Sequence, residues 1–229
     1  MKPVALITGA AGLIGGYLVR SASRWVPDWE VRGLTRTEVD LTDRAQMQRC
    51  WERHRPDLVI HCAALSRTGL CEQDPARARL INVEATRSLA DLARDVPFAF
   101  LSTDQVFDGA KGHYVETDAV HPLNVYGQTK VEAEQAVLEN PAHAVVRIAL
   151  TAGTSPTRDR SFVEDMLRAA SKGMTLTLFT DEFRCPMPAG ALVRALWEFA
   201  VQRRPGVYHL GGHERLSRWE IGELLAARF

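Results

Sequence analysis

Short apolar runs, several of them rich in β-branched residues, alternate along the chain with longer stretches of helical periodicity. The runs are typical of strands buried between helices, since a parallel strand is covered on both faces. Six strands are predicted: Val4–Thr8, Glu30–Thr35, Leu58–Cys62, Phe98–Ser102, Ala144–Ala149 and Val207–Leu210. Apolar residues three and four positions apart predict seven helices: Leu13–Arg24, Arg44–His54, Pro75–Arg94, Val125–Leu138, Phe162–Ser171, Ala191–Gln202 and Ser217–Arg228.

The repeated order of strand and helix predicts an α/β fold built on a doubly wound parallel (Rossmann) sheet. The polar stretch Thr151–Ser161 predicts a mobile loop at the point where the chain leaves the sheet. We therefore expect a dinucleotide-binding domain in residues 1–150 and 189–212, and a small substrate lobe in residues 151–188 and 213–229. Since one predicted helix is all that follows Gly212, we expect this lobe to be incomplete. The helix over Pro75–Arg94 is expected to bury a stripe of four residues: Leu80, Ile81, Leu89 and Leu92.

Composition and charge narrow the classes of protein to which the chain can belong. Hydrophobic residues make up 46% of the 229 residues, and 28 lysines and arginines balance 28 aspartates and glutamates. This composition excludes a disordered chain, and the zero net charge removes the electrostatic case for binding nucleic acid or an anionic membrane. No apolar stretch reaches the roughly 18 residues of a membrane span.

Cysteine and histidine spacing predicts neither disulfides nor a metal site. The histidines show no ligand spacing such as HExxH. The four cysteines form no CxxC pair, which favours reduced thiols in a cytoplasmic protein. They are widely separated: Cys50, Cys62, Cys71 and Cys185.

A glycine-rich segment joins the first predicted strand to the first predicted helix. Its GxxGxxG spacing, at that junction, is typical of a turn that binds a dinucleotide. Gly9 would form the tight turn, Gly12 would let a pyrophosphate approach the backbone, and Gly15 would allow close packing of helix and strand. The helix N-terminus would supply N–H donors, and a plain turn with incidental glycines is the alternative. The predicted cofactor contacts are Gly9, Gly12, Leu13, Ile14 and Gly15.

The end of the second strand bears on the choice of cofactor. A site selective for NAD usually has a carboxylate there, which accepts hydrogen bonds from the ribose. This chain has Arg36 instead, and a guanidinium favours a 2′-phosphate. Glu38 lies close by, and Arg36 could also be a solvated loop charge. The residues favour NADP(H).

Tyr126 and Lys130 share one face of a predicted helix, because residues four apart are neighbours there. A cation beside a phenol lowers the phenol's pKa, which would make Tyr126 usable as an acid or base near neutral pH. Thr103 follows the fourth strand, at the sheet edge where such folds bind ligands. Its hydroxyl could donate a hydrogen bond to a substrate carbonyl.

With these residues and the motifs around them, the chain resembles the extended short-chain dehydrogenase/reductases, and within them the dTDP-4-dehydrorhamnose reductase branch. The segment STDQVFDG at 102–109 is the most specific of the motifs, which follow the branch in order along essentially the whole chain. The others are TGAAGLIG at 8–15, DLTD at 40–43, HCAA at 61–64, NV at 82–83, the Tyr126/Lys130 pair, FV at 162–163, DEFRCP at 181–186 and GVYHLGG at 206–212.

The resemblance implies a reductase of the keto group of a nucleotide-activated deoxysugar, with NADPH as the preferred cofactor and NAD as the alternative. A homodimer is the assembly that is compatible with the resemblance. Its implied catalytic set is Thr103, Tyr126 and Lys130, with Asn82 supporting a proton relay. Further implied cofactor contacts are Arg36, Asp40, Leu41, Cys62, Ala63, Ala64, Tyr126 and Lys130. The implied substrate contacts are Ser66, Asp104, Gln105, Val106 and Arg184.

Two features leave the substrate and the activity open. Gln105 stands where the family commonly has tyrosine, and the segment Ile148–Leu150 lacks the family's aromatic residue. The branch also contains a non-catalytic relative, the regulatory β subunit of methionine adenosyltransferase, so a cofactor-binding regulatory subunit is the alternative. Four arginines could hold a nucleotide diphosphate or be plain surface charges: Arg147, Arg158, Arg160 and Arg184.

Overall fold

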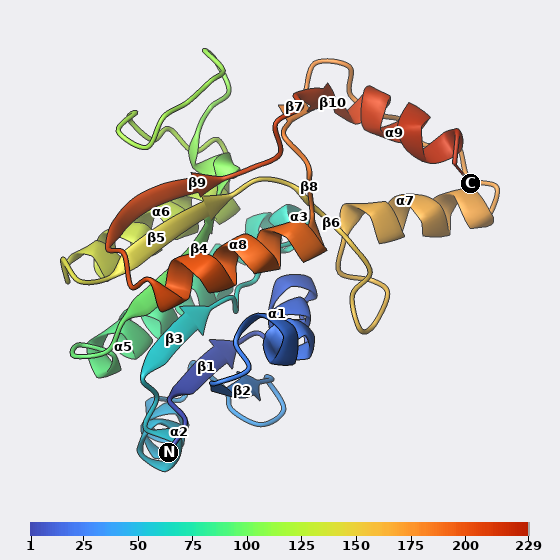
Figure 1. Cartoon of the computed structure of the whole chain (residues 1–229). Coiled ribbons are helices and arrows are strands. Elements are labelled where there is room, and N and C mark those ends of the chain that lie inside the picture. The colour runs from blue at the N-terminus through green and yellow to red at the C-terminus, as the bar shows by residue number, and fades with distance from the viewer. Residues whose placement is uncertain (229) are drawn as a thin grey trace.

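A six-stranded parallel sheet forms the centre of the computed structural model, which describes residues 1–228 (Figure 1). The strand order is β2-β1-β3-β4-β5-β9, so the order reverses between β1 and β3. In folds of this kind, ligands bind in the crevice outside the carboxyl ends of the strands at that reversal. The strands are β1 (Val4–Thr8), β2 (Glu30–Leu34), β3 (Leu58–His61), β4 (Phe98–Thr103), β5 (Ala144–Ile148) and β9 (Gly206–Leu210).

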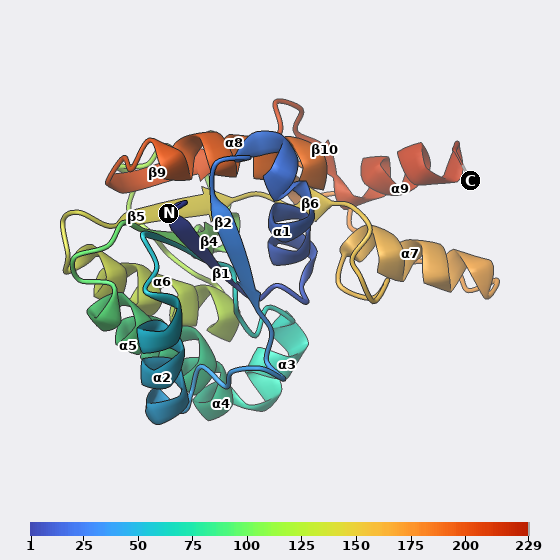
Figure 2. The same ribbon diagram turned by 60° about the horizontal axis from the view of Figure 1, so that its bottom comes forward.

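Helices cover both faces of this sheet (Figure 2). Helices α1 (Leu13–Trp25) and α8 (Ala189–Val201) pack together on one face, where Trp197 is buried and its indole N–H donates to the carbonyl of Leu18. Helices α2 (Arg44–His54), α5 (Ala85–Leu92) and α6 (Val125–Leu138) cover the other. Alternate residues of β1 serve the two cores, since Ile7 packs on the first face and Leu6 on the second. The predicted α/β class and doubly wound sheet are confirmed.

The stretch predicted as one helix, Pro75–Arg94, is three segments. A turn of π-helix, Leu80–Glu84, separates α4 (Pro75–Arg79) from α5. The wider turn shifts the helical register, so that Leu80 is 46% exposed while Asn82 and Val83 are buried. The predicted burial of Leu80 is therefore wrong, and that of Leu89 is confirmed. A short helix, α3 (Thr68–Gln73), precedes these segments.

Two very short sheets and two helices extend beside the large sheet (Figure 1). Strand β6 (Thr151–Ala152) pairs with β8 (Met187–Pro188), and β7 (Phe183–Arg184) pairs with β10 (Leu216–Ser217). Helices α7 (Phe162–Ser171) and α9 (Arg218–Ala226) each begin with a serine and glutamate capping box. Within residues 1–228, no helix is long and apolar enough to cross a bilayer.

A buried ion pair ties α6 to β5. The Arg147 guanidinium donates to the Glu134 carboxylate at 2.7 Å, and both side chains are under 10% exposed. The ring of Phe107 lies 5.2 Å from the guanidinium carbon. Both earlier interpretations of Arg147 are therefore wrong: the fold itself uses its charge, so it is neither a surface charge nor free to bind a diphosphate.

Candidate functional site

The glycine turn between β1 and α1 has a shape that a dinucleotide fits. Gly9 has a φ of 69°, and the N–H of Gly12 donates to its carbonyl at 2.8 Å. A Cβ on Gly9 would lie 2.8 Å from the backbone nitrogen of Ala63, so this turn lies directly against the loop after β3. Within residues 1–228 no side chain caps the N-terminus of α1, which leaves its first N–H groups available to a pyrophosphate.

A buried hydrogen-bonded network holds the loop after β3 in place. Thr8 Oγ1 accepts from the N–H groups of Cys62 and Ala63, so its own proton goes to His61 Nδ1 at 2.7 Å. The other ring nitrogen of His61 then donates to Thr86 Oγ1 at 2.9 Å. Burial, helped by the nearby Lys130 charge, lowers the pKa of His61 to about 3 and keeps the ring neutral. This network was not predicted from the sequence, although it holds the backbone of two predicted cofactor contacts, Cys62 and Ala63.

At the end of β2, the two nearby carboxylates are held in local turns. Glu38 accepts from the N–H and hydroxyl of Thr35, and Asp40 accepts from the N–H and hydroxyl of Thr42. Arg36 is exposed beside them and forms no ion pair within residues 1–228. One oxygen of each carboxylate is thus engaged by a neighbouring threonine, while the Arg36 guanidinium is exposed beside them.

Thr103 and Tyr126 lie close together at the carboxyl edge of the sheet. Thr103 ends β4, and its hydroxyl donates to Asp104 at 3.2 Å while accepting from the N–H of Gln105. Tyr126 lies in the first turn of α6, where the Asn124 side chain caps the helix by accepting from the N–H of Gly127 at 2.8 Å. Thr103 is 6% exposed and Tyr126 is 8% exposed, so a carbonyl beside them would be shielded from water.

Lys130 lies one turn after Tyr126, and its ammonium bonds to the sheet. Its ammonium donates to the carbonyl of Leu101 at 2.6 Å and lies 3.8 Å from the Phe100 ring centre. Burial lowers the pKa of Lys130 to about 7, against the opposing effects of Glu134 and Cys62.

The pKa of Tyr126 differs from the expectation that Lys130 would lower it. Burial raises this pKa, and the Asp104 carboxylate and the Cys71 thiol raise it further. The Thr103 hydroxyl and the Arg184 charge act in the opposite direction. Lys130 is not among the main causes of this shift. Tyr126 is therefore a protonated phenol, which is the form that an acid requires.

Asn82, predicted to support a proton relay, uses its amide to position backbone. It lies in the π-helical turn, where its oxygen accepts from the N–H of Leu65 at 2.8 Å. Its nitrogen donates to the carbonyl of Leu65 and to Thr129 Oγ1, at 3.1 and 3.0 Å. Thr129 in turn donates to the carbonyl of Tyr126. Both amide hydrogens are engaged, so Asn82 links the loop after β3 to the helix that bears Tyr126.

Replacing Asn82 with alanine is expected to destabilise the fold by about 1–3 kcal/mol, because the N–H of Leu65 loses its buried acceptor. Denaturant unfolding monitored by tryptophan fluorescence would measure the change. Unfolding at the wild-type midpoint would contradict this positioning role.

The sequence and the fold of this chain resemble those of known proteins. The model of one protein family, described as the RmlD substrate binding domain, matches residues 1–229. The chain belongs to the RmlD family. The dTDP-4-dehydrorhamnose reductase of Bacillus anthracis, solved in complex with NADP, is 25% identical with a TM-score of 0.92, covering 100% of this chain and 81% of that chain. The resemblance inferred from the motifs is confirmed.

Two of the curated relatives of this chain differ in kind. The dTDP-4-keto-6-deoxy-D-glucose reductase of Streptomyces niveus is 34% identical over 89% of this chain and 71% of its own length. The methionine adenosyltransferase 2 subunit beta of Xenopus laevis is 32% identical over 98% of this chain and 72% of its own length. Both the enzyme and the regulatory subunit anticipated from the sequence are thus among the relatives.

On the substrate side of this RmlD family site, a chain of charges reaches from β4 to β7 and α9. Arg184 on β7 lies 3.3 Å from the Asp104 carboxylate, and its side chain is 13% exposed. Glu182 lies 4.0 Å from Arg184 and 2.8 Å from Arg218. Burial raises the pKa of Asp104, while Arg184, Thr103 and Arg218 oppose that shift. In the described residues, Arg184 Nε is buried without a hydrogen-bond partner.

The remaining predicted substrate contacts lie in different surroundings. Gln105 is half-buried, and its side-chain oxygen accepts from Asn124 at 3.1 Å, which leaves its amide hydrogens free. Ser66 is exposed. Val106 is 0% exposed, so its side chain cannot contact a ligand in this structure, contrary to the prediction. The reason is local, since Val106 packs inward from a short 3₁₀ turn that follows Thr103.

A cavity of about 640 Å³ lies elsewhere, between α7 and α9. Its lining is almost entirely apolar, and none of the predicted site residues takes part in it. The polar groups described above converge instead at the carboxyl edge of β4, beside Thr103 and Tyr126. Among the described residues, no cluster of His, Cys, Asp or Glu is arranged to hold a metal ion.

Proposed function

We propose that this chain is an NADPH-dependent reductase acting on the keto group of a nucleotide-activated deoxysugar. The observation that carries the proposal is the position of Thr103 and Tyr126, buried together at the carboxyl edge of β4. The glycine turn that suits a dinucleotide lies at the same edge of the sheet, after β1. The names of the reductase relatives supply the substrate class.

The cofactor would be held by the glycine turn, by the loop after β3 and by Arg36, and when bound it supplies a hydride. Tyr126 donates its proton to the substrate oxygen. Thr103 turns its hydroxyl from Asp104 toward the same oxygen and polarises the carbonyl. General acid catalysis of this kind contributes roughly 10²–10⁴-fold.

Lys130 and Arg184 act on the surroundings of Thr103 and Tyr126. Lys130 holds the carbonyl of Leu101 and so fixes the end of β4. Arg184 pairs with Asp104, which weakens the hold of that carboxylate on the Thr103 hydroxyl and leaves the hydroxyl proton available to substrate.

Steady-state oxidation of NADPH, followed by loss of the reduced nicotinamide absorbance, tests the activity. The substrates are dTDP-4-keto-6-deoxysugars, and a dTDP-sugar without a keto group is the control. The proposal predicts turnover with the keto sugars alone. No turnover with any of them, at a saturating concentration of cofactor, would contradict it.

A cofactor-binding regulatory subunit is the second candidate, favoured by the 32% identity to methionine adenosyltransferase 2 subunit beta. This candidate requires NADPH binding without keto-sugar turnover, and a stable complex with a methionine adenosyltransferase catalytic subunit. Size-exclusion chromatography of the mixed proteins separates the two candidates.

Removing the Arg36 guanidinium should weaken NADPH binding about tenfold, the effect of losing a charge-assisted hydrogen bond to the 2′-phosphate. Binding of NADH, which lacks that phosphate, should be unchanged. Fluorescence titration of Arg36→Ala with each cofactor measures both, and Arg49→Ala, an exposed arginine on α2, is the control. Equal loss of affinity for the two cofactors would contradict the assigned role of Arg36.

A further inference from the structure

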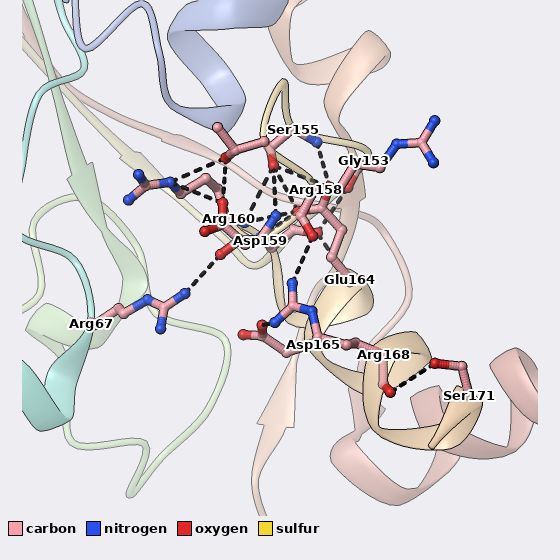
Figure 3. Close-up of polar contacts among 12 residues, drawn as sticks. Arg67, Gly153, Ser155, Arg158, Asp159, Arg160, Glu164, Asp165, Arg168 and Ser171 are labelled. Atoms are coloured by element: carbon pink, nitrogen blue, oxygen red, sulfur yellow. Dashed lines mark hydrogen bonds and ion pairs between the residues drawn. The ribbon is translucent and has the colours of Figure 1, made fainter. Parts of the chain in front are cut away.

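The loop after β6, residues 153–161, is a segment that we call the strap (Figure 3). Two of its serines are buried, since Ser155 is 3% exposed and Ser161 is 5% exposed. The hydroxyl of Ser161 donates to the carbonyl of Gly153 at 2.8 Å, which closes the strap into a compact ring of backbone.

Glu164, in the first turn of α7, organises the strap from within. Its carboxylate accepts from the N–H groups of Ser155, Arg160 and Ser161 at 2.7, 2.9 and 2.9 Å, and from the Ser155 hydroxyl. Burial alone would raise the pKa of Glu164, but these hydrogen bonds outweigh it and lower the pKa below its usual value. The glutamate is therefore charged, and charge-assisted bonds of this kind are strong.

The strap packs against the first turns of α1, directly after the glycine turn. The N–H of Thr154 donates to the Tyr17 hydroxyl at 3.3 Å. The side chain of Pro156 approaches so closely that a Cβ on Gly16 would lie 3.1 Å from it. One side of the strap is thus anchored on the helix whose N-terminus is predicted to bind the pyrophosphate.

The other side of the strap is bonded to the loop after β3. The Arg67 guanidinium donates to the carbonyl of Asp159 at 2.7 Å, and Figure 3 shows it extending from the segment before α3 to the strap. Since β1 and β3 are neighbours, their two following loops flank the crevice at the strand-order reversal. The strap is thus bonded to an element on each side of that reversal, to α1 through Tyr17 and to the loop after β3 through Arg67.

We propose that the strap is a latch over the bound dinucleotide, and that Arg67 and Ser155 are positioning residues that keep it closed. This inference rests on the proposed function for the presence of the cofactor. Exchange of the cofactor requires the strap to leave Arg67. Loosening the strap should therefore speed both entry and departure of the dinucleotide, and change its affinity much less.

Stopped-flow kinetics with NADPH test the latch in the full chain. Association is followed by energy transfer from tryptophan, and dissociation by displacing NADPH with excess NADP⁺. Arg67→Ala should raise both rate constants about fivefold, as expected for one lost hydrogen bond. Their ratio, the dissociation constant for NADPH, should stay within about twofold of wild type. Ser155→Ala, which removes a hydroxyl bonded to Glu164, should act in the same direction.

Two matched variants control for nonspecific effects. Arg77→Ala removes an exposed arginine on α4, and Ser171→Ala removes a hydroxyl that bonds to the carbonyl of Arg168. Both should keep wild-type rate constants. If Arg67→Ala raised the dissociation rate constant alone, Arg67 would act only as a contact to the bound cofactor, and the latch would be overturned.

Tryptic cleavage after Arg158 or Arg160 gives a second readout, because both residues are exposed on the strap. Saturating NADPH should protect these bonds in the wild type and protect them less in Arg67→Ala. If the wild type binds NADPH but is cleaved equally with and without it, the latch is contradicted. Failure of the wild type to bind NADPH at all would overturn the proposed function, and the latch with it.

Discussion

Replacing Tyr126 with phenylalanine is expected to lower the turnover number with a dTDP-4-keto-6-deoxysugar by about 10³-fold, within the range of general acid catalysis. The change removes the one phenol hydroxyl beside Thr103 and keeps the ring that packs in the first turn of α6. The dissociation constant for NADPH should stay within about twofold of wild type, since the ring contacts are retained. Steady-state kinetics and a fluorescence titration measure the two quantities.

Tyr114→Phe is the matched control, because Tyr114 bonds to Asp108 in the long loop after β4 and lies outside the predicted site. It should keep wild-type turnover. Tyr126→Phe that retains more than about a tenth of wild-type turnover would exclude Tyr126 as the acid.

Replacing Gly15 with alanine is expected to have the second-largest effect. A Cβ there would lie 2.8 Å from the carbonyl carbon of Gly9, and backbone on that side cannot yield as a side chain could. Overpacking of this kind costs about 1–3 kcal/mol of unfolding free energy. Moving the glycine turn by about 1 Å would also misplace the cofactor and lower turnover about 10²-fold.

Gly190→Ala provides the control for this prediction. Gly190 lies in α8, and a Cβ there would meet nothing within 4 Å. Alanine should leave turnover unchanged and stabilise the helix by up to about 1 kcal/mol. Thermal unfolding and turnover of the two variants can be compared directly. Equal behaviour of the two alanines would show that the glycine turn tolerates a side chain.

The large sheet could be predicted from the sequence because its central strands, β1, β3 and β4, are buried apolar runs and helical stretches alternate with all six strands. All six predicted strands lie within one residue of the observed ones, and β1 coincides with the prediction. The π-helical turn could not be predicted, since its different hydrogen-bonding pattern leaves no mark on hydrophobic spacing. The two-residue strands β6, β7, β8 and β10 were not predicted either, because they are defined by main-chain pairing between segments far apart in the sequence.

The candidate site was predictable where its residues form short motifs. Thr103 and Tyr126 follow a strand end and open a helix, so the pattern alone places both at one edge of the sheet. The network from Thr8 through His61 to Thr86 joins residues 53 and 25 positions apart, which no local pattern records. The ion pair of Arg147 is likewise invisible before β5 and α6 are packed together.

The contact that the Lys130 ammonium makes could also not be predicted from the sequence. Helical spacing puts Lys130 on the same face as Tyr126, but the side chain of a lysine is long enough to reach several partners. Its ammonium bonds to Leu101 of the adjacent strand, and this choice depends on the packing of α6 on β4. A cofactor ribose would meet Lys130 as a positioning group already fixed by the sheet.

The most direct test of keto-sugar reduction is a single-turnover experiment with NADPH deuterated at the nicotinamide C4 position. Enzyme in excess is mixed with the labelled cofactor and a dTDP-4-keto-6-deoxysugar, and the product is examined by mass spectrometry and NMR. The proposed function predicts one deuterium on the carbon that carried the keto oxygen, and none in Tyr126→Phe. Tight binding of the labelled cofactor with no deuterium in the sugar would contradict reduction and favour the regulatory subunit.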